Sequence, residues 1–157
     1  MVSNMQSQTC TCPCGESTFV IKSKPLIRFY CHCTICQSLY KKTFVDVSAL
    51  WAGNVELPEN HNLHFGKYRL PPALSRGICK SCSSPVVGFL RLAPFVRLAF
   101  FPSRSVEDES SLRDSQGHIF YHRCLAESGD ALPKFSGYWK SELAVTSMLI
   151  GSMLKRS

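Results

Sequence analysis

Three cysteines within six residues, Cys31, Cys33 and Cys36, are the residues of this chain best placed to do chemistry. One residue separates the first pair and two separate the second, which is too close for three independent core cysteines. An odd number of thiols cannot pair internally as disulfides. We therefore interpret the cluster as one metal ion held by three thiolates, and three protein ligands on a tetrahedral ion leave its fourth position open.

An open position on a zinc ion has a clear chemical use. The ion lowers the pKa of a bound thiol or water and polarises a carbonyl as a Lewis acid. Three thiolates around Zn²⁺ carry a net negative charge, so an incoming thiolate is bound less tightly and stays reactive. Lys67, Arg69 and Arg76 lie near a further cysteine pair in sequence and are candidates to meet substrate carboxylates.

Three residues could instead close the fourth position and make the cluster purely structural: Cys10, His32 or Cys124. Cys10 is the most plausible of them, because it lies beside another group of cysteines. His32 lies inside the cluster itself, where its geometry is unfavourable, and Cys124 is most simply a buried free cysteine. An iron–sulfur cluster is less favoured because the spacing matches neither common ferredoxin pattern, whereas thiolate-rich sites of this kind favour zinc.

A second set of cysteines has the composition of a closed zinc site. Cys12 and Cys14 form one short pair, and Cys79 and Cys82 form another far along the chain. Together they supply four thiolates, the tetrahedral set of a structural zinc. Such a site would join the N-terminal turn to the middle of the chain, and a structural zinc contributes folding energy directly.

Composition supports metal binding inside the cell. The 157 residues suit one domain with a hydrophobic core, and 45% hydrophobic with 18% charged residues argue against disorder. The polar N-terminus lacks the apolar region of a secretory signal, so the clustered cysteines among the nine are expected to bind metal rather than form disulfides. No run reaches the ~20 apolar residues of a membrane span. We expect a cytoplasmic protein.

The positive charge does not by itself indicate nucleic-acid binding. The formal charge is +7, but seven thiolates on two Zn²⁺ contribute −3 and reduce it to about +4. The basic residues are scattered and form no arginine-rich segment, so a nucleic-acid partner is not expected. The sequence has no phosphate-binding glycine loop and no other common catalytic motif. His61, His64, His118 and His122 are interpreted as strand or loop histidines.

Short apolar and β-branched runs predict a chain made mostly of strands. Residues 1–9 are expected to be a flexible leader, residues 34–41 a short helical turn, and residues 67–75 and 104–116 loops. The runs at 86–92 and 96–101 are so apolar that we expect both faces to be buried. The predicted strands are residues 17–21, 26–30, 43–47, 86–92, 96–101 and 118–122, with shorter pieces at 55–57 and 63–65.

The C-terminal segment has a different pattern. Residues 141–155 carry a broad apolar face, and Lys155 and Arg156 suit a helix C-terminus. We expect an amphipathic helix within residues 138–157, docked on the domain or on a second subunit, so that homo-oligomers through this helix are possible. A helix that binds a membrane surface or a partner protein is the alternative.

The cysteine layout resembles that of the glutathione-dependent formaldehyde-activating enzyme family, which includes centromere protein V-like members. The resemblance follows Cys12, Cys14 and Gly15, then Cys31-His32-Cys33 with Cys36, then Cys79 and Cys82. His118-Ile119-Phe120 and Leu132-Pro133-Lys134-Phe135 resemble the C-terminal pattern of that family. The resemblance covers residues 10–137 and does not include the terminal helix.

The resemblance implies a mainly β fold of antiparallel sheets with two zinc ions. It implies a structural zinc at Cys12, Cys14, Cys79 and Cys82 and a catalytic zinc at Cys31, Cys33 and Cys36. The implied activity is of the carbon–sulfur lyase class, like that of S-(hydroxymethyl)glutathione synthase, with a zinc-held thiolate of glutathione adding to formaldehyde or a related carbonyl. Gln37 stands where members often have Arg, and Ser83-Ser84 where the second pair usually continues with Gly.

Two other functions compete with the enzyme. A scaffold or interaction protein would have both zincs structural and would use its basic surface and terminal helix to meet a partner. A nucleic-acid-binding zinc ribbon would use the positive charge, but the chain lacks a basic stripe with interleaved aromatic residues. The fourth ligand at Cys31, Cys33 and Cys36 distinguishes the enzyme from the scaffold.

Overall fold

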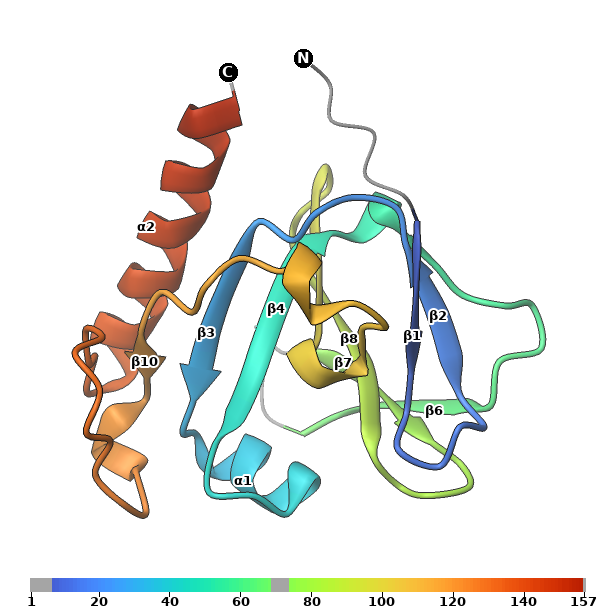
Figure 1. The fold of residues 1–157 in the computed structure, drawn as a ribbon, viewed down its shortest axis with the longest axis horizontal. Coiled ribbons are helices and arrows are strands. Elements are labelled where there is room, and N and C mark those ends of the chain that lie inside the picture. Colours follow the sequence, from blue (N-terminus) through green and yellow to red (C-terminus); the bar gives the residue numbers. More distant parts are fainter. Residues whose placement is uncertain (1–6, 69–73, 157) are drawn as a thin grey trace.

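The structure is a computed structural model that describes residues 7–68 and 74–156. It is a mainly β protein with a long C-terminal helix, so the predicted fold class is confirmed (Figure 1). The small sheet has the order β1-β2-β5, with β1 (Gln8–Thr11), β2 (Thr18–Ile21) and β5 (Val55–Glu56). The large sheet has the order β10-β3-β4-β9-β8-β7-β6. Its strands are β3 (Ile27–Cys31), β4 (Val45–Trp51), β6 (Leu63–Lys67), β7 (Ser75–Cys79), β8 (Pro85–Ala93), β9 (Val96–Pro102) and β10 (His118–Ile119).

The pairing within the described sheets is antiparallel except at one edge. There, the two-residue strand β10 runs parallel to β3, and His118 is opposite Tyr30. This pairing brings the segment after β10 next to the end of β3. The other elements of the described residues are the helices α1 (Thr34–Tyr40) and α2 (Tyr138–Arg156) and four short 3₁₀ turns, Ala52–Asn54, Ser103–Ser105, Glu109–Ser111 and Tyr121–Arg123.

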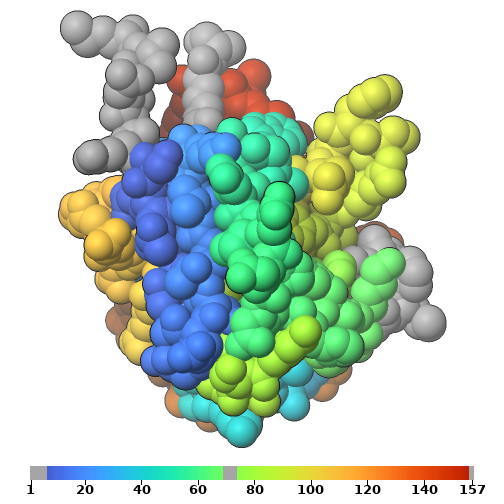
Figure 2. All heavy atoms as spheres, turned by 90° about the vertical axis from the view of Figure 1, so that its right-hand side faces the viewer, coloured from blue at the N-terminus to red at the C-terminus, as the bar shows by residue number. Residues whose placement is uncertain are grey.

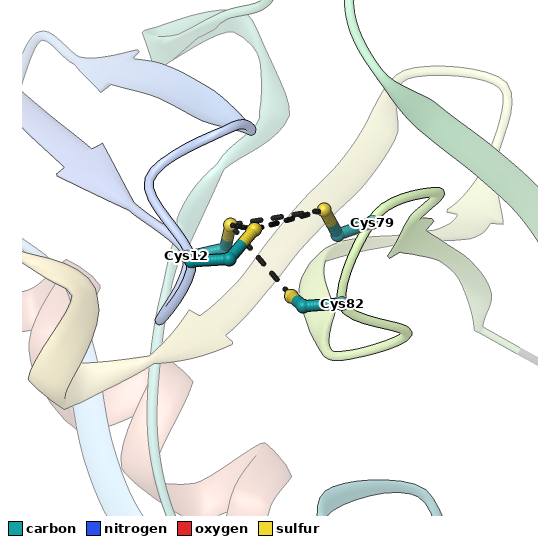
Figure 3. Close-up of side chains that lie close together, drawn as sticks. Cys12, Cys79 and Cys82 are labelled. Atoms are coloured by element: carbon teal, nitrogen blue, oxygen red, sulfur yellow. Dashed lines mark hydrogen bonds between the residues drawn. The ribbon is translucent and has the colours of Figure 1, made fainter.

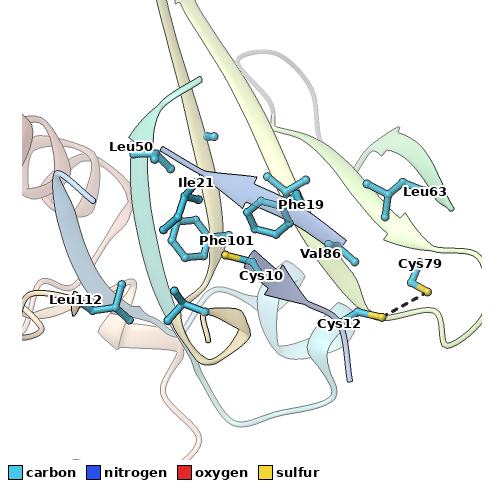
Figure 4. Close-up of a cluster of buried hydrophobic side chains, with 13 residues drawn as sticks. Cys10, Cys12, Phe19, Ile21, Leu50, Leu63, Cys79, Val86, Phe101 and Leu112 are labelled. Carbon is cyan, nitrogen blue, oxygen red and sulfur yellow. Dashed lines mark hydrogen bonds between the residues drawn. The ribbon is translucent and has the colours of Figure 1, made fainter. Parts of the chain in front are cut away.

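The large sheet has a separate hydrophobic cluster on each face, because side chains alternate along its strands. In β9, Ala99 and Phe101 belong to one cluster, while Leu98 belongs to the other. The first cluster lies under the small sheet, where Phe19 packs edge-on against Phe101 at 5.7 Å between ring centroids (Figure 4). The second cluster contains Phe29 and Ile119 and is covered by α2.

The predicted C-terminal helix is confirmed as α2, which begins at Tyr138 after Gly137 in a left-handed conformation (φ +94°). Ala144 and Leu149 are its buried apolar contacts with the second cluster. The buried Ser141 hydroxyl accepts a hydrogen bond from the backbone N–H of Phe120 at 2.8 Å, which fastens the helix to the segment after β10. No helix among the described residues is both long and apolar enough to cross a membrane.

Several element boundaries differ from the predictions. β1 begins at Gln8, inside the segment 1–9 that was expected to be a flexible leader, and residues 1–6 lie outside the described chain. The strand predicted at 43–47 begins only at Val45 and continues to Trp51. The strand predicted at 118–122 ends at Ile119, because Phe120 has a left-handed backbone (φ 52°) and a 3₁₀ turn follows.

The expectation that residues 86–92 and 96–101 are buried on both faces is wrong for the hairpin that joins them. Val86 and Val87 are buried, but Leu92 is 55% exposed and Phe95 is 96% exposed. The tip of the hairpin extends past the rest of the large sheet and stands out from the surface (Figure 2). The two apolar runs therefore predict burial correctly for only part of each strand.

Candidate metal centres and an adjoining cavity

The first cysteine cluster joins two turns that are far apart in sequence. Cys12 and Cys14 lie in the turn between β1 and β2, where the N–H of Gly15 donates to the carbonyl of Cys12 at 3.0 Å. Cys79 ends β7, and Cys82 lies in the turn before β8. This turn is closed by hydrogen bonds from Ser83 N–H to the Cys79 carbonyl and from Cys79 N–H to the Ser84 carbonyl, both 2.9 Å long.

The sulfur atoms of this cluster have the spacing that zinc requires. Sulfurs at the corners of a tetrahedron with Zn–S bonds of about 2.3 Å are about 3.8 Å apart. Here Cys12 Sγ lies 3.4 Å from Cys14 Sγ, 3.8 Å from Cys79 Sγ and 3.9 Å from Cys82 Sγ (Figure 3). Cys14 Sγ and Cys79 Sγ are 3.7 Å apart. The four residues could hold one metal ion.

The second cluster lies on the other side of the large sheet. Cys31 is the last residue of β3, Cys33 is the N-cap of α1, and Cys36 lies in its first turn. The Cys33 sulfur accepts a hydrogen bond from the N–H of Cys36 at 3.3 Å, which orients it toward its neighbours. The three sulfurs lie within 4.8 Å of one another, and this cluster could also hold a metal ion.

Three thiols this close together cannot all be anionic unless a cation lies among them. Hydrogen bonds from Cys31 and Cys36 lower the pKa of Cys33 to about 3. The same contact with Cys33, together with burial, raises the pKa of Cys31 well above its usual value. One thiol is thus ionised at the expense of the others, whereas a divalent ion would stabilise all three as thiolates.

None of the three residues considered as an alternative fourth ligand belongs to the second cluster in the described chain. Cys10 is completely buried in the other hydrophobic cluster, and burial raises its pKa to about 12. His32 turns away from the sulfurs and makes a hydrogen bond to His118. Cys124 is half-buried rather than fully buried.

Arg76 of β7 is the charged residue closest to the second cluster among the contacts of the described chain. Its Nη2 lies 3.9 Å from Cys36 Sγ. Burial lowers the pKa of Arg76, but the neighbouring thiols of Cys36, Cys33 and Cys31 and the hydroxyl of Tyr40 together raise it more, so the guanidinium remains charged. Of the other two candidate cations, Lys67 is exposed at the end of β6 and Arg69 lies outside the described residues. A β-bulge between Gly77 and Ile78 separates Arg76 from Cys79 of the first cluster.

A cavity of about 420 Å³ adjoins the second cluster. All three cysteines and Arg76 contribute to its lining. Its walls also include Tyr40 of α1 and residues of α2, the helix that was expected to dock on the domain or on a second subunit. The cysteine spacing predicted the cluster, but a cavity formed by α1, the large sheet and α2 left no local signal in the sequence.

A chain of hydrogen bonds runs away from the second cluster on its far side. His32 Nε2 lies 2.8 Å from His118 Nδ1, and His118 Nε2 lies 2.8 Å from Asp130 Oδ2. Because the carboxylate accepts, His118 donates from Nε2, and in the neutral form of His118 its Nδ1 accepts from His32. His118 is thus a strand histidine, as predicted, but its side chain ties the Cys31–Cys36 segment to the loop that contains Asp130.

The two departures from the family pattern have different surroundings. The Gln37 amide donates to the carbonyls of Thr43 and Arg123, at 3.2 and 2.8 Å, and Gln37 does not line the cavity. It therefore fixes the position of the turn that contains Arg123. Ser83 has a left-handed backbone (φ 61°), a conformation that glycine adopts at less cost.

These features define a class of protein: a mainly β fold with two cysteine clusters that could each hold a metal ion, one of them beside a cavity. Comparison with protein-family models matches residues 7–123 to the glutathione-dependent formaldehyde-activating enzyme family. The chain belongs to this family, and the predicted resemblance is confirmed. A search of curated proteins finds no match.

Proposed function

We propose that the protein is a zinc-dependent enzyme of the carbon–sulfur lyase type that joins a thiol such as glutathione to formaldehyde or a related carbonyl. The observation that carries this proposal is the three-thiol cluster in the wall of a cavity, with a charged arginine beside it. Family membership supports the same activity. A scaffold with two structural zincs is a poorer explanation, because it gives the cavity beside the three thiols no use.

Cys31, Cys33 and Cys36 would hold the catalytic zinc, which supplies a Lewis-acid position that lowers the pKa of a thiol. Cys12, Cys14, Cys79 and Cys82 would hold a structural zinc. The sulfur distances in the first cluster, and the mutual repulsion that three thiolates in the second cluster would have without a cation, support metal binding at both.

The residues around the cavity can assist the proposed addition in two ways. The Arg76 guanidinium offsets negative charge at the sulfurs and favours the ionised form of a substrate thiol. In the reaction, sulfur forms a bond to the carbonyl carbon, and the π electron pair moves to oxygen, which takes up a proton. Burial raises the pKa of Tyr40, so its hydroxyl stays protonated in the cavity and is available as the donor.

The remaining expectations have partial support. The cysteines of the described chain are free, which suits a reducing compartment, and the cytoplasm is the proposed location. Association of two copies through α2 remains a prediction. It is supported by apolar side chains of α2 that are exposed in the single chain, namely Trp139, Leu143, Ile150, Met153 and Leu154.

The proposed function is tested by the rate of adduct formation from formaldehyde and glutathione with zinc-loaded protein. We expect a rate above the spontaneous reaction and a loss of that excess in Cys33→Ser. Cys124→Ser is the matched control, because Cys124 belongs to neither cluster and does not line the cavity, and it should keep the activity. If neither glutathione nor any other thiol of a panel reacts faster with the protein present, the scaffold is the better interpretation.

A further inference from the structure

The cavity is much larger than formaldehyde requires. Its volume of about 420 Å³ lies in the range of about 300–1,000 Å³ that is typical of pockets for ligands of drug size. Formaldehyde has two heavy atoms and would leave nearly all of this space to water. The dimensions of the cavity therefore indicate a substrate with a larger group attached to its reacting atoms.

The walls next to the three thiols are apolar. The large sheet contributes Phe29 of β3, Val87 of β8 and Phe100 of β9, and the Phe29 and Phe100 rings pack edge-on at 6.4 Å between centroids. Ile119 of β10 and Val145 of α2 also line the cavity. Water against these surfaces would be displaced favourably by an apolar group, at about 25 cal/mol per Å².

Most of the charged side chains that line the cavity are exposed to solvent. Arg76 is half-buried and lies against the thiols, whereas His122, Arg123 and Glu142 are exposed to solvent. Glutathione carries two carboxylates and an ammonium group, which are costly to bury without partners. These charges can be accommodated among the exposed residues, but they cannot fill the apolar interior. The apolar group must then belong to the carbonyl substrate.

Part of the apolar wall lies outside the segment that defines the family. The family match ends at residue 123, and α2 begins at Tyr138. Tyr138, Glu142 and Val145 of α2 all line the cavity. The three thiols and Arg76 lie within the match, so the reacting groups come from the matched segment and one wall of the space beside them comes from this helix.

We propose that the carbonyl substrate is an aldehyde with an apolar chain or ring of several carbons, which lies between the large sheet and α2. The proposal rests on the proposed function, since it uses the same thiol addition. The thiol sulfur bonds to the aldehyde carbon, the π pair of the carbonyl moves to oxygen, and the proton released by the thiol ends on that oxygen. The product is a hemithioacetal, and no oxidant or reductant is needed.

The first test measures binding rather than turnover. S-alkylglutathiones are stable analogues of the product, and calorimetry on the zinc-loaded protein gives their dissociation constants from S-methyl to S-hexyl. We expect affinity to rise by up to about fourfold per methylene that the cavity buries. In parallel, kcat/KM with glutathione should be higher for hexanal than for formaldehyde.

Variants of α2 test whether this helix determines how affinity depends on the length of the alkyl chain. Val145→Phe should reduce the ratio of S-hexyl to S-methyl affinity about tenfold or more by filling the cavity. Ser147→Phe places the same ring on an exposed position of the helix outside the cavity lining and should keep the ratio. If Val145→Phe does not fold, Val145→Ala provides the second test, because it should shift the preference toward longer chains.

The outcomes separate this inference from the proposed function. Turnover of formaldehyde with affinities that stay within about twofold across the alkyl series would overturn the apolar aldehyde and leave the function intact. A steep alkyl series with no turnover of any aldehyde would overturn both, because the carbonyl would then have no role. A steep series together with faster turnover of hexanal supports the inference.

Discussion

Arg76 sets the charge around the three-thiol cluster. It is the cation nearest to these sulfurs among the described contacts, and its guanidinium lies 3.9 Å from Cys36 Sγ. We predict that Arg76→Gln lowers kcat/KM about tenfold or more, because an opposite charge at this distance shifts a thiol pKa by one to three units. Steady-state kinetics with a zinc assay check the prediction, and Arg76→Lys should recover part of the rate. An unchanged kcat/KM in a zinc-replete Arg76→Gln protein would remove this role.

Ser83 shows how a departure from the family pattern affects stability rather than chemistry. Its left-handed backbone (φ 61°) is unfavourable for a residue with a Cβ, and its N–H still closes the turn onto Cys79. We predict that Ser83→Gly stabilises the protein by about 0.5–1 kcal/mol. Denaturant unfolding measures the change. Ser84→Gly is the control, because Ser84 has no positive φ and its hydroxyl bonds to Cys82, so this change should be destabilising.

At the scale of elements, the segment after β10 is held in place by polar contacts rather than by a strand. The chain of His32, His118 and Asp130 connects β3 to this segment, and Ser141 fastens α2 to the same place. The sequence pattern showed an apolar run at 118–122 but could not show its partners. The hydrogen bonds join residues as far as 86 positions apart in the chain.

Asp130 provides the test of this connection. Hydrogen bonds from Ser128 and then from His118 hold the pKa of Asp130 well below its usual range. A carboxyl whose pKa is lower in the folded state stabilises the fold fully above its unfolded pKa of about 3.9, and this contribution is lost progressively as the pH falls from that value through the lower folded pKa. We predict that Asp130→Asn is less stable than wild type at pH 7 and that the difference shrinks below pH ~4.

Denaturant unfolding of both proteins at pH 7 and at pH ~3 measures this difference. Asp114→Asn is the control, since Asp114 is an exposed aspartate outside the chain of histidines. A stability difference between wild type and Asp130→Asn that is the same at both pH values would contradict the prediction.

The elements that could be predicted from the sequence are those with a strong local pattern. The terminal helix has a continuous apolar face, and the strands at 17–21 and 26–30 lie within a residue of β2 and β3. Exposure of Phe95 in the hairpin could not be predicted, because hydrophobicity does not reveal which part of a strand a second sheet covers. The same limit explains why α2 was expected to pack and not to line a cavity.

At the scale of the whole molecule, the two cysteine clusters lie on opposite faces of one sheet. Cys12 and Cys79 belong to the hydrophobic cluster under the small sheet, and Cys31 and Cys36 belong to the cluster under α2. Ligand spacing predicted the membership of both groups, since it is a local property. The environment of each group depends on the packing of distant strands, which is why Cys10 was a plausible fourth ligand in sequence but lies in the wrong hydrophobic cluster.

This arrangement predicts unequal effects of removing a ligand from each site. The first site joins Cys12 to Cys79, which are 67 residues apart, and so connects the small sheet to β7 and β8. The second site closes a segment of six residues, from Cys31 to Cys36, that β3 and α1 already hold. A constraint on a longer loop removes more entropy from the unfolded chain.

We therefore predict that the purified protein contains two zinc ions, that Cys33→Ser loses one and stays folded, and that Cys79→Ser unfolds. A structural zinc contributes free energy of the order of the whole stability of a small domain, so losing it is sufficient for unfolding. Metal content by elemental analysis, with circular dichroism and thermal unfolding, measures both effects. Cys10→Ala is the control, because Cys10 ligates neither site and should keep both ions at a cost of about 1 kcal/mol from lost core packing. If Cys33→Ser unfolded as completely as Cys79→Ser, the three-thiol site would be structural as well, and the cavity beside it would need another explanation.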